Sequence, residues 1–284
     1  MPHTVADINR LIETLWPLSG AESWDAPGLL AGDPGAPVSA IHLAVDAVMD
    51  TVDEAVELGA SLLLVHHPLL MRGVTTVAGT TYKGAVLSKL IKADCALVAA
   101  HTNADVVADG TSGVFAARLG LEGSRAIQGE PGVDRASHGL GRVGTLPNPT
   151  TLGELAGHLG ELLPATAGGI RVSGDFDAPI STVALCGGAG DSLLADPAVV
   201  GADVFITSDL RHHPASEARE NARVAGGPAL IDVSHWASEW LWLDTAAAQL
   251  REALPDVTVT VSDLRTDPWD FVVVQNNRVE KLWP

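Results

Sequence analysis

Short, mostly apolar runs that end directly in polar side chains are the feature that most constrains how this chain can fold. Four of these runs occupy residues 61–65, 95–100, 202–207 and 229–233. Runs of this length are typical of strands that are covered on both faces, as in a parallel sheet. Between the runs, apolar residues recur three and four positions apart, as in residues 48–58, which predicts helices. The alternation of the two patterns predicts an α/β fold.

Further elements follow from the same patterns. Helices are predicted over residues 8–15, 82–93, 152–163 and 235–253, and strands over 40–46, 169–173, 180–186, 257–261 and 270–274. The segment 23–33 contains two glycines and an acidic pair, so it is predicted to be a loop. The glycine-rich polar stretch from about 123 to 147 is predicted to be a connection with one short strand, and it is the best candidate for a domain boundary.

Charge and composition exclude several classes of protein. The formal net charge is −18, which argues against nucleic acid or an anionic membrane as the main partner because both require a basic surface. No apolar run approaches the ~20 residues of a membrane-spanning helix, and no signal peptide is recognisable. Cys95 and Cys186 lie in apolar runs without a CxxC motif, which favours buried reduced thiols over a disulfide or thiolate zinc site. A cytoplasmic protein is therefore expected.

The first candidate for chemistry is the pair His66-His67, which follows the run 61–65. Adjacent side chains of a strand point to opposite faces, so both imidazoles can converge only if the strand ends there. Pro68 supports such an end because it lacks a backbone N–H for the ladder. The motif alone leaves metal ligation and a structural role equally open.

The second candidate is His101-x-Asn103-x-Asp105, which follows the run 95–100. In extended backbone these three side chains would lie in one row. The alternative is a turn stabilised by Asn and Asp side chains, which suits Asn103 better than Asp105.

The third candidate is His235 with Glu239, four residues apart at the start of a predicted helix. Residues at this spacing share one face of a helix, an arrangement that is also common by chance on protein surfaces. Here the helix follows the run 229–233, so the pair is expected to project from the same sheet edge as the other candidates.

Together these residues form a mixed nitrogen and oxygen ligand set, which suits Zn, Mn, Fe or Ni. The candidate ligands are too many for one open tetrahedral ion, since they number five: His66, His67, Asp105, His235 and Glu239. Two divalent ions, about 3.5–4 Å apart and bridged by one carboxylate, account for the number. A weaker candidate is the segment 187–192, GGAGDS, whose backbone N–H groups could hold an anion or could form a tight turn.

Several motifs, taken in order, resemble one family. They are WDAPGLLAGDP, VHHPLL, AHTNAD, CGGAGDSL, TSDLRHHPA and SHWASE. Their order and spacing resemble the GTP cyclohydrolase 1 type 2 homologues, also called the dinuclear metal-centre or NGG-interacting-factor-like family. The resemblance spans about residues 5 to 275, and the chain looks like the short form without the central inserted domain. Ala26, Pro27 and Ser208 depart from the residues usual in the family, which are Asn, Val and Gly.

The resemblance implies a ligand set: one ion on His67 and Asp105, the other on His66 and His235, with Glu239 bridging both. It also places His101 and His213 near the ions, where they would support the ligands or meet the substrate. Related proteins form hexameric rings whose metal sites face the central cavity, so a homohexamer is expected.

The fold implied by the resemblance consists of two interlinked α/β domains with mixed, largely parallel sheets. We expect the first domain to comprise residues 1–125, completed by 230–284, and the second to comprise 126–229. The metal site would then lie in the cleft between them.

The expected function is that of a metal-dependent hydrolase acting on a nucleotide or phosphorylated small molecule. The family resemblance points to opening of the GTP ring, and phosphoester hydrolysis is the nearest alternative. A different class also remains open, namely a non-catalytic metal-binding or regulatory ring with protein partners.

Overall fold

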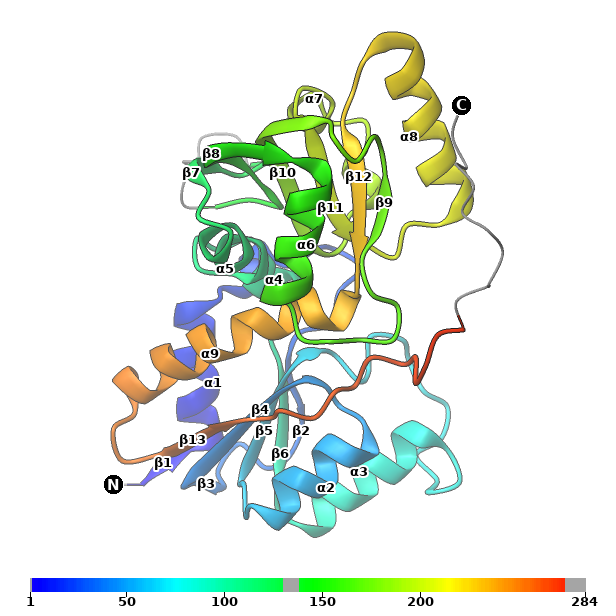
Figure 1. Ribbon diagram of the computed structural model, residues 1–284. Coiled ribbons are helices and arrows are strands. Elements are labelled where there is room, and N and C mark those ends of the chain that lie inside the picture. The colour runs from blue at the N-terminus through cyan, green and yellow to red at the C-terminus, as the bar shows by residue number, and fades with distance from the viewer. Residues whose placement is uncertain (1, 130–137, 274–284) are drawn as a thin grey trace.

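The protein is described by a computed structural model over residues 2–129 and 138–273. Two sheets lie one above the other in Figure 1, and helices cover their faces. This is the predicted α/β architecture with mixed, largely parallel sheets. In the described ranges no helix is both long and apolar enough to cross a membrane.

The first sheet has five strands in the order β13, β4, β5, β6, β2. Their bounds are Thr258–Val261 for β13, Ala40–Asp46 for β4, Leu62–His67 for β5, Ala96–Ala99 for β6 and Gly28–Ala31 for β2. The first four run parallel, whereas β2 runs antiparallel to β6. Because β4, β5 and β6 are parallel, their carboxyl ends meet at one edge of the sheet.

Helices α2 (Met49–Glu57) and α3 (Tyr82–Lys92) cover one face of this sheet, and α1 (Val5–Leu15) lies on the other. The start of α1 is fixed by a capping box, in which Thr4 and Asp7 satisfy each other's backbone N–H. A short antiparallel ribbon of β1 (His3–Thr4) and β3 (Pro37–Val38) flanks the helix.

The second sheet has six strands in the order β7, β8, β10, β11, β12, β9. Their bounds are Glu122–Arg125 for β7, Arg142–Thr151 for β8, Pro179–Ala189 for β10, Val204–Ser208 for β11, Ala229–Val233 for β12 and Arg171–Ser173 for β9. Strands β10, β11 and β12 are parallel and the others are antiparallel to their neighbours.

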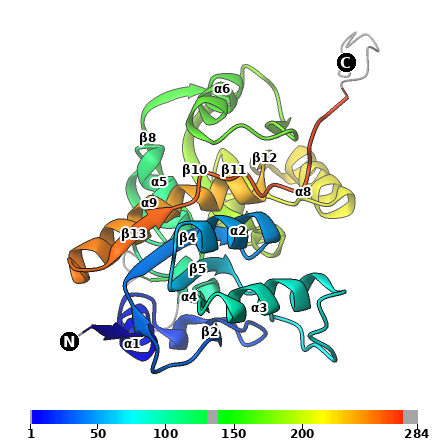
Figure 2. The same ribbon diagram turned by 90° about the horizontal axis from the view of Figure 1, so that it is seen from below.

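The remaining elements connect or cover these strands. They are η1 (Leu18–Gly20), α4 (Thr102–Asp105), α5 (Thr111–Arg118), α6 (Leu152–Leu162), η2 (Asp191–Leu193), α7 (Pro197–Val200), α8 (His212–Ala225) and α9 (His235–Ala253). Helix α9 lies between the two sheets, where it contacts β4 and β13 of the first and β10 and β11 of the second (Figures 1 and 2). One hydrophobic core runs through both sheets around this helix.

Three elements differ from the sequence-based predictions. Residues 28–31 form β2 rather than part of a loop. The strand is difficult to predict because it is short and is bounded by Gly28 and Gly32, both of which have positive φ. Strand β8 is long rather than short, with Pro147 and Pro149 in the stretch where its register with β10 shifts. Residues 270–273 are not a strand, and residue 274 of that prediction lies outside the described ranges.

Sheet membership changes between β6 and β7 and again between β12 and β13. Strands β7 and β12 thus belong to the second sheet. The domain boundaries at residues 125/126 and 229/230 stay a prediction.

Candidate metal centre

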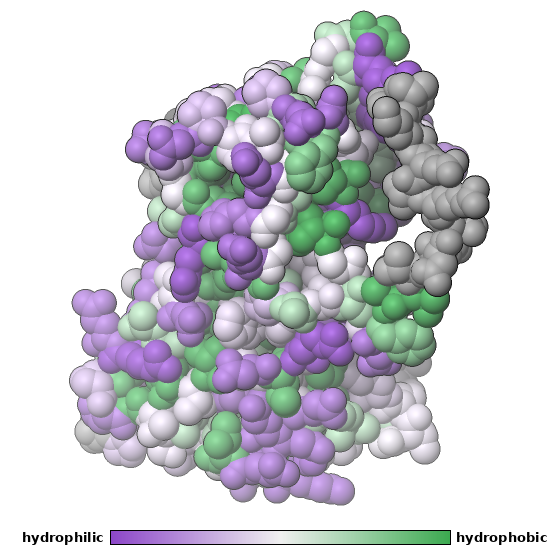
Figure 3. Space-filling view, viewed as in Figure 1, coloured by the Kyte–Doolittle hydropathy of each residue, from purple (hydrophilic) through white to green (hydrophobic). Residues whose placement is uncertain are grey.

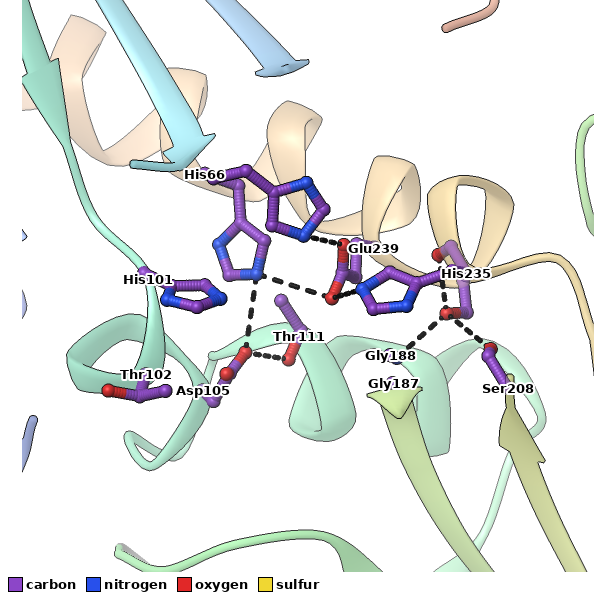
Figure 4. Close-up of polar contacts among 12 residues, drawn as sticks. His66, His101, Thr102, Asp105, Thr111, Gly187, Gly188, Ser208, His235 and Glu239 are labelled. Atoms are coloured by element: carbon purple, nitrogen blue, oxygen red, sulfur yellow. Dashed lines mark hydrogen bonds and ion pairs between the residues drawn. The ribbon is translucent and has the colours of Figure 1, made fainter. Parts of the chain in front are cut away.

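The five candidate ligands converge between the two sheets, and Figure 4 labels four of them, His66, Asp105, His235 and Glu239. His66 and His67 end β5, Asp105 lies in α4 just after β6, and His235 and Glu239 lie in the first turns of α9, directly after β12. The prediction of a single sheet edge was therefore wrong, because β12 belongs to the second sheet. Apolar periodicity reveals where a strand ends but not which sheet it joins.

The carboxylate of Glu239 lies at the centre of this group. Its Oε1 is 3.4 Å from Nε2 of His66 and 2.9 Å from Nε2 of His235, while its Oε2 is 2.9 Å from Nε2 of His67. The Glu239 side chain is only 4% exposed. A buried carboxylate with imidazole nitrogens near both oxygens is arranged as a bridging ligand would be.

The remaining contacts are shared among the ligands. Nε2 of His66 lies 3.6 Å from Oδ1 of Asp105, and the ring centroid of His67 lies 5.1 Å from those of both His66 and His235. Oε1 of Glu239 contacts His66 and His235, whereas Oε2 contacts His67. The division of the ligands between two ions that the family resemblance implies stays a prediction.

Each imidazole of the site is fixed by a hydrogen bond from its Nδ1 to an oxygen. The pairs are His66 to Ala100 O (2.8 Å), His67 to Asp46 Oδ1 (2.7 Å), His101 to Asp25 Oδ1 (2.8 Å) and His235 to Asp209 Oδ2 (2.8 Å). Because carbonyl and carboxylate oxygens only accept, Nδ1 carries the proton in every ring. The Nε2 lone pairs are then available to a metal, an arrangement typical of metal-binding histidines.

Two buried atoms of the centre lack a hydrogen-bond partner within the described residues, namely Nε2 of His66 and Oε2 of Glu239. Nε2 of His67 and Oε2 of Glu239 face each other at 2.9 Å, and a neutral ring would set lone pair against lone pair. A proton or a metal ion between them removes that conflict. Ligands with bonds of about 2.0–2.2 Å to one ion lie roughly 3–3.5 Å apart, close to the distances here. The residues therefore fit metal ions.

In the metal-free site, the carboxylates and the imidazoles shift one another's pKa values. Burial raises the pKa of Glu239, but the neighbouring imidazoles outweigh burial and hold the pKa well below its usual value. Burial lowers the pKa of His67, but Glu239 and the hydrogen bond to Asp46 raise it to about 10. Burial, with a smaller contribution from Glu239, raises the pKa of Asp105, although His66 opposes it. Without metal, protons on the imidazoles balance the carboxylate.

His101 lies beside the centre, with one ring nitrogen within 4.8 Å of one on both His66 and His67. Asp25 positions it, since Oδ1 accepts from the ring and Oδ2 accepts from the backbone N–H of Thr102. The predicted extended row was wrong, because residues 102–105 form α4. Asn103 faces away: its Oδ1 accepts from the His101 N–H and its Nδ2 donates to the Trp16 carbonyl. This is the turn-stabilising role that the sequence left open.

Two other candidates from the sequence are His213 and the segment 187–192. His213 is exposed in the first turn of α8, next to the ring of His212. In segment 187–192, the N–H groups of Gly187 and Gly188 donate to Ser112 and Ser238, so neither is available to an anion. Gly188 instead lies close to the side chain of Glu239 in α9. Its φ is +73°, and a Cβ there would lie 2.4 Å from Oε1 of Glu239.

Sequence reasoning did not identify the acceptors Asp25, Asp46 and Asp209 or the close approach of Gly188. A signal for two of them was present. Asp46 ends the predicted strand 40–46, and Asp209 is the second residue after the run 202–207, so both lie at strand ends, as the histidines do. The closeness of Gly188 to Glu239 depends on the packing of α9 against β10, which no local pattern reports.

Comparisons with known proteins show which family the chain resembles. The family model for Duf34/NIF3 (NGG1p interacting factor 3) matches residues 3–268. A GTP cyclohydrolase 1 type 2 homolog of Streptomyces coelicolor is 49% identical over 269 residues, which cover 93% of each chain. The homolog of Mycobacterium leprae is 34% identical over 376 aligned positions, covering 95% of this chain and 96% of that relative. The larger alignment length reflects extra residues in the relative, as expected if this chain is the short form.

Solved structures support the fold. A Staphylococcus aureus hypothetical protein has a TM-score of 0.86 and 29% identity, covering 96% of this chain and all of that one. A Bacillus cereus protein related to NIF3 has a TM-score of 0.87, with the same coverage, at 23% identity. From the family model, the relatives and the shared fold, the chain belongs to the Duf34/NIF3 (NGG1p interacting factor 3) family.

Proposed function

We propose that this protein is a metal-dependent hydrolase that binds two divalent ions and acts on a nucleotide or phosphorylated small molecule. The observation that carries the proposal is the buried carboxylate of Glu239, which has imidazole Nε2 atoms near both oxygens. Every one of those imidazoles has its Nδ1 occupied, so its second nitrogen has no other role than to meet a proton or a metal.

The ligands would divide as the family resemblance implies. His66 and His235, which share Oε1 of Glu239, would hold one ion, and His67, which meets Oε2, would hold the other together with Asp105. The mixture of imidazole and carboxylate suits Zn, Mn, Fe or Ni. When bound, such a pair lowers the pKa of water to near neutrality and polarises a substrate oxygen.

His101 adds a group that can handle a proton. Its Nδ1 is held by Asp25, which keeps Nε2 free on the side of His66 and His67. From that position the ring can accept a proton at Nε2 from a group bound at the centre, or can serve as a further ligand.

The names of the relatives refer to GTP cyclohydrolase, and the same activity is one form of this proposal. Protein loaded with Mn²⁺ or Zn²⁺ should be assayed with GTP, by the absorbance change of ring opening, and with phosphodiesters. We expect turnover that requires metal and is lost in Glu239→Gln. The exposed Glu252 lies on the same helix, so Glu252→Gln is the matched control and should keep full activity.

An absence of turnover on either class, in protein that holds two ions, would contradict the hydrolase. A stable complex with another protein under those conditions would favour the alternative, a non-catalytic metal-binding ring.

A further inference from the structure

A cavity of about 750 Å³ adjoins the metal centre on the side of His67 and His235. Its other walls come from β12, from the loop 167–169 and from the C-terminal segment 266–272. This segment leaves the first sheet after β13 and crosses toward α8, as the red ribbon shows in Figure 1. A group that reaches the two ions from this side therefore extends into the cavity.

The charges of the cavity wall are mostly negative. Besides His67 and His235 at the metal centre, four aspartates line it, against one arginine, Arg171, and no lysine. Arg171 forms an ion pair with Asp232, which offsets its charge. Asp267 accepts from the Ser234 hydroxyl and from the Trp269 backbone N–H. Away from the metal centre, a chain of phosphates would meet mostly carboxylates rather than the cations that usually bind it.

The same wall offers aromatic surface that nothing in the described chain covers. Trp269 is 68% exposed and Phe271 is 80% exposed, and both line the cavity. Figure 3 shows hydrophobic residues gathered at the right of the molecule, where the described chain ends. Asp267 accepts from the backbone N–H of Trp269, which orders the turn that carries this ring. Flat heteroaromatic rings stack on such side chains.

We propose that this cavity binds an uncharged heteroaromatic ring of the substrate, such as a nucleobase, and excludes a polyphosphate chain. The inference rests on the proposed function, since it assigns the reacting group to the two ions. It also narrows that function: the ring of the substrate lies in this cavity, and its phosphate groups lie toward the metals rather than along the cavity wall.

Binding of guanosine and of GTP, measured by calorimetry, tests the proposal. Both are titrated into metal-loaded protein and into the same protein after chelation. We expect guanosine to bind to both forms. GTP should bind the chelated form at least tenfold more weakly than guanosine does. Added salt should strengthen that weak GTP binding, because it screens repulsion between like charges. Tighter binding of GTP than of guanosine to the chelated form, weakened by salt, would overturn the proposal.

Variants test the ring contact. Trp269→Leu should weaken guanosine binding about tenfold, the usual effect of losing one base–aromatic stack, and Trp269→Phe should restore most of it. Phe176 is 68% exposed and does not line the cavity, so Phe176→Leu is the control. Guanosine binding that is equal in Trp269→Leu and in the unaltered protein would contradict the assignment.

Metal content separates the two proposals. All three variants should hold as much metal as the unaltered protein. If no variant or parent binds metal but guanosine binding depends on Trp269, the hydrolase proposal fails and the ring site stands. If two ions bind but Trp269 has no effect, only the ring site fails.

Discussion

Nε2 of His67 lies 2.9 Å from Oε2 of Glu239, and this contact connects the first sheet with the helix that follows a strand of the second. His67 ends β5 of the first sheet, whereas Glu239 belongs to α9, which continues from β12 of the second. The contact thus joins the two halves of the molecule at the candidate metal centre. Metal binding and the packing of the halves are expected to depend on each other.

Removing the bridging carboxylate should have the largest effect. Glu239→Gln keeps the shape of the side chain but loses the charge that faces His66, His67 and His235. We expect at most one ion per chain instead of two, measured by elemental analysis after dialysis. The metal-free variant should also be less stable by about 3–5 kcal/mol in urea, the usual cost of breaking a buried ion pair. Equal metal content in this variant and in Glu252→Gln would contradict the bridging role.

The acceptors behind the imidazoles should matter for affinity. Asp46→Asn and Asp209→Asn keep size and leave an amide oxygen, but they weaken the hydrogen bonds that fix His67 and His235. Loss of such partners typically lowers metal affinity about 10–100-fold. Competition with a coloured chelator measures the affinity. Asp50 is exposed near the start of α2, and Asp50→Asn, the control, should bind as the parent does.

The stability of the metal-free protein should fall as pH rises from about 6.5 to 10. The pKa of His67 is raised from 6.5 to about 10, so its contribution is fully present below 6.5 and is lost as pH passes the folded value. Glu239 has a lowered pKa, so its contribution is present above 4.5 and is lost only in stronger acid. Maximal stability without metal is thus expected between about 4.5 and 6.5.

Metal should reverse this trend, because an ion replaces the protons on the imidazoles. Urea unfolding at pH 6 and pH 9, with and without metal, provides the measurement. We expect the stabilisation by metal to be larger at pH 9. Stabilisation that is equal at both values would mean that the ion does not compete with these protons.

Gly188 should tolerate no side chain. A Cβ at this position would lie 2.4 Å from Oε1 of Glu239, and its φ of +73° also disfavours other residues. Gly188→Ala is expected to cost about 1–2 kcal/mol from the backbone alone and to displace Glu239, which lowers metal content. In α6, a Cβ on Gly157 would meet nothing within 4 Å, so Gly157→Ala should stabilise the protein by about 0.5–1 kcal/mol without affecting metal. Thermal unfolding and elemental analysis distinguish the two.

Local patterns carried much of the fold and of the candidate site. The strand ends at His66, His101 and His235 were visible because apolar runs stop abruptly there. The strand β2 was missed, since its four residues, Gly28–Ala31, leave too short a pattern. The hydrogen bonds of His66 to the Ala100 carbonyl and of His67 to Asp46 were also beyond the sequence, because they depend on which way each ring turns out of β5. The sequence left two roles open for Asn103, a place in one row with His101 and Asp105 or the stabilisation of a turn. Only the backbone of α4 decides between them.

The proposed function requires that each chain hold two divalent ions. The most direct test is elemental analysis of protein purified without a chelator or a histidine tag, then reconstituted with Zn²⁺ or Mn²⁺ and dialysed. We expect two equivalents per chain in the parent and at most one in Glu239→Gln. A parent protein that retains no divalent metal under these conditions would contradict it.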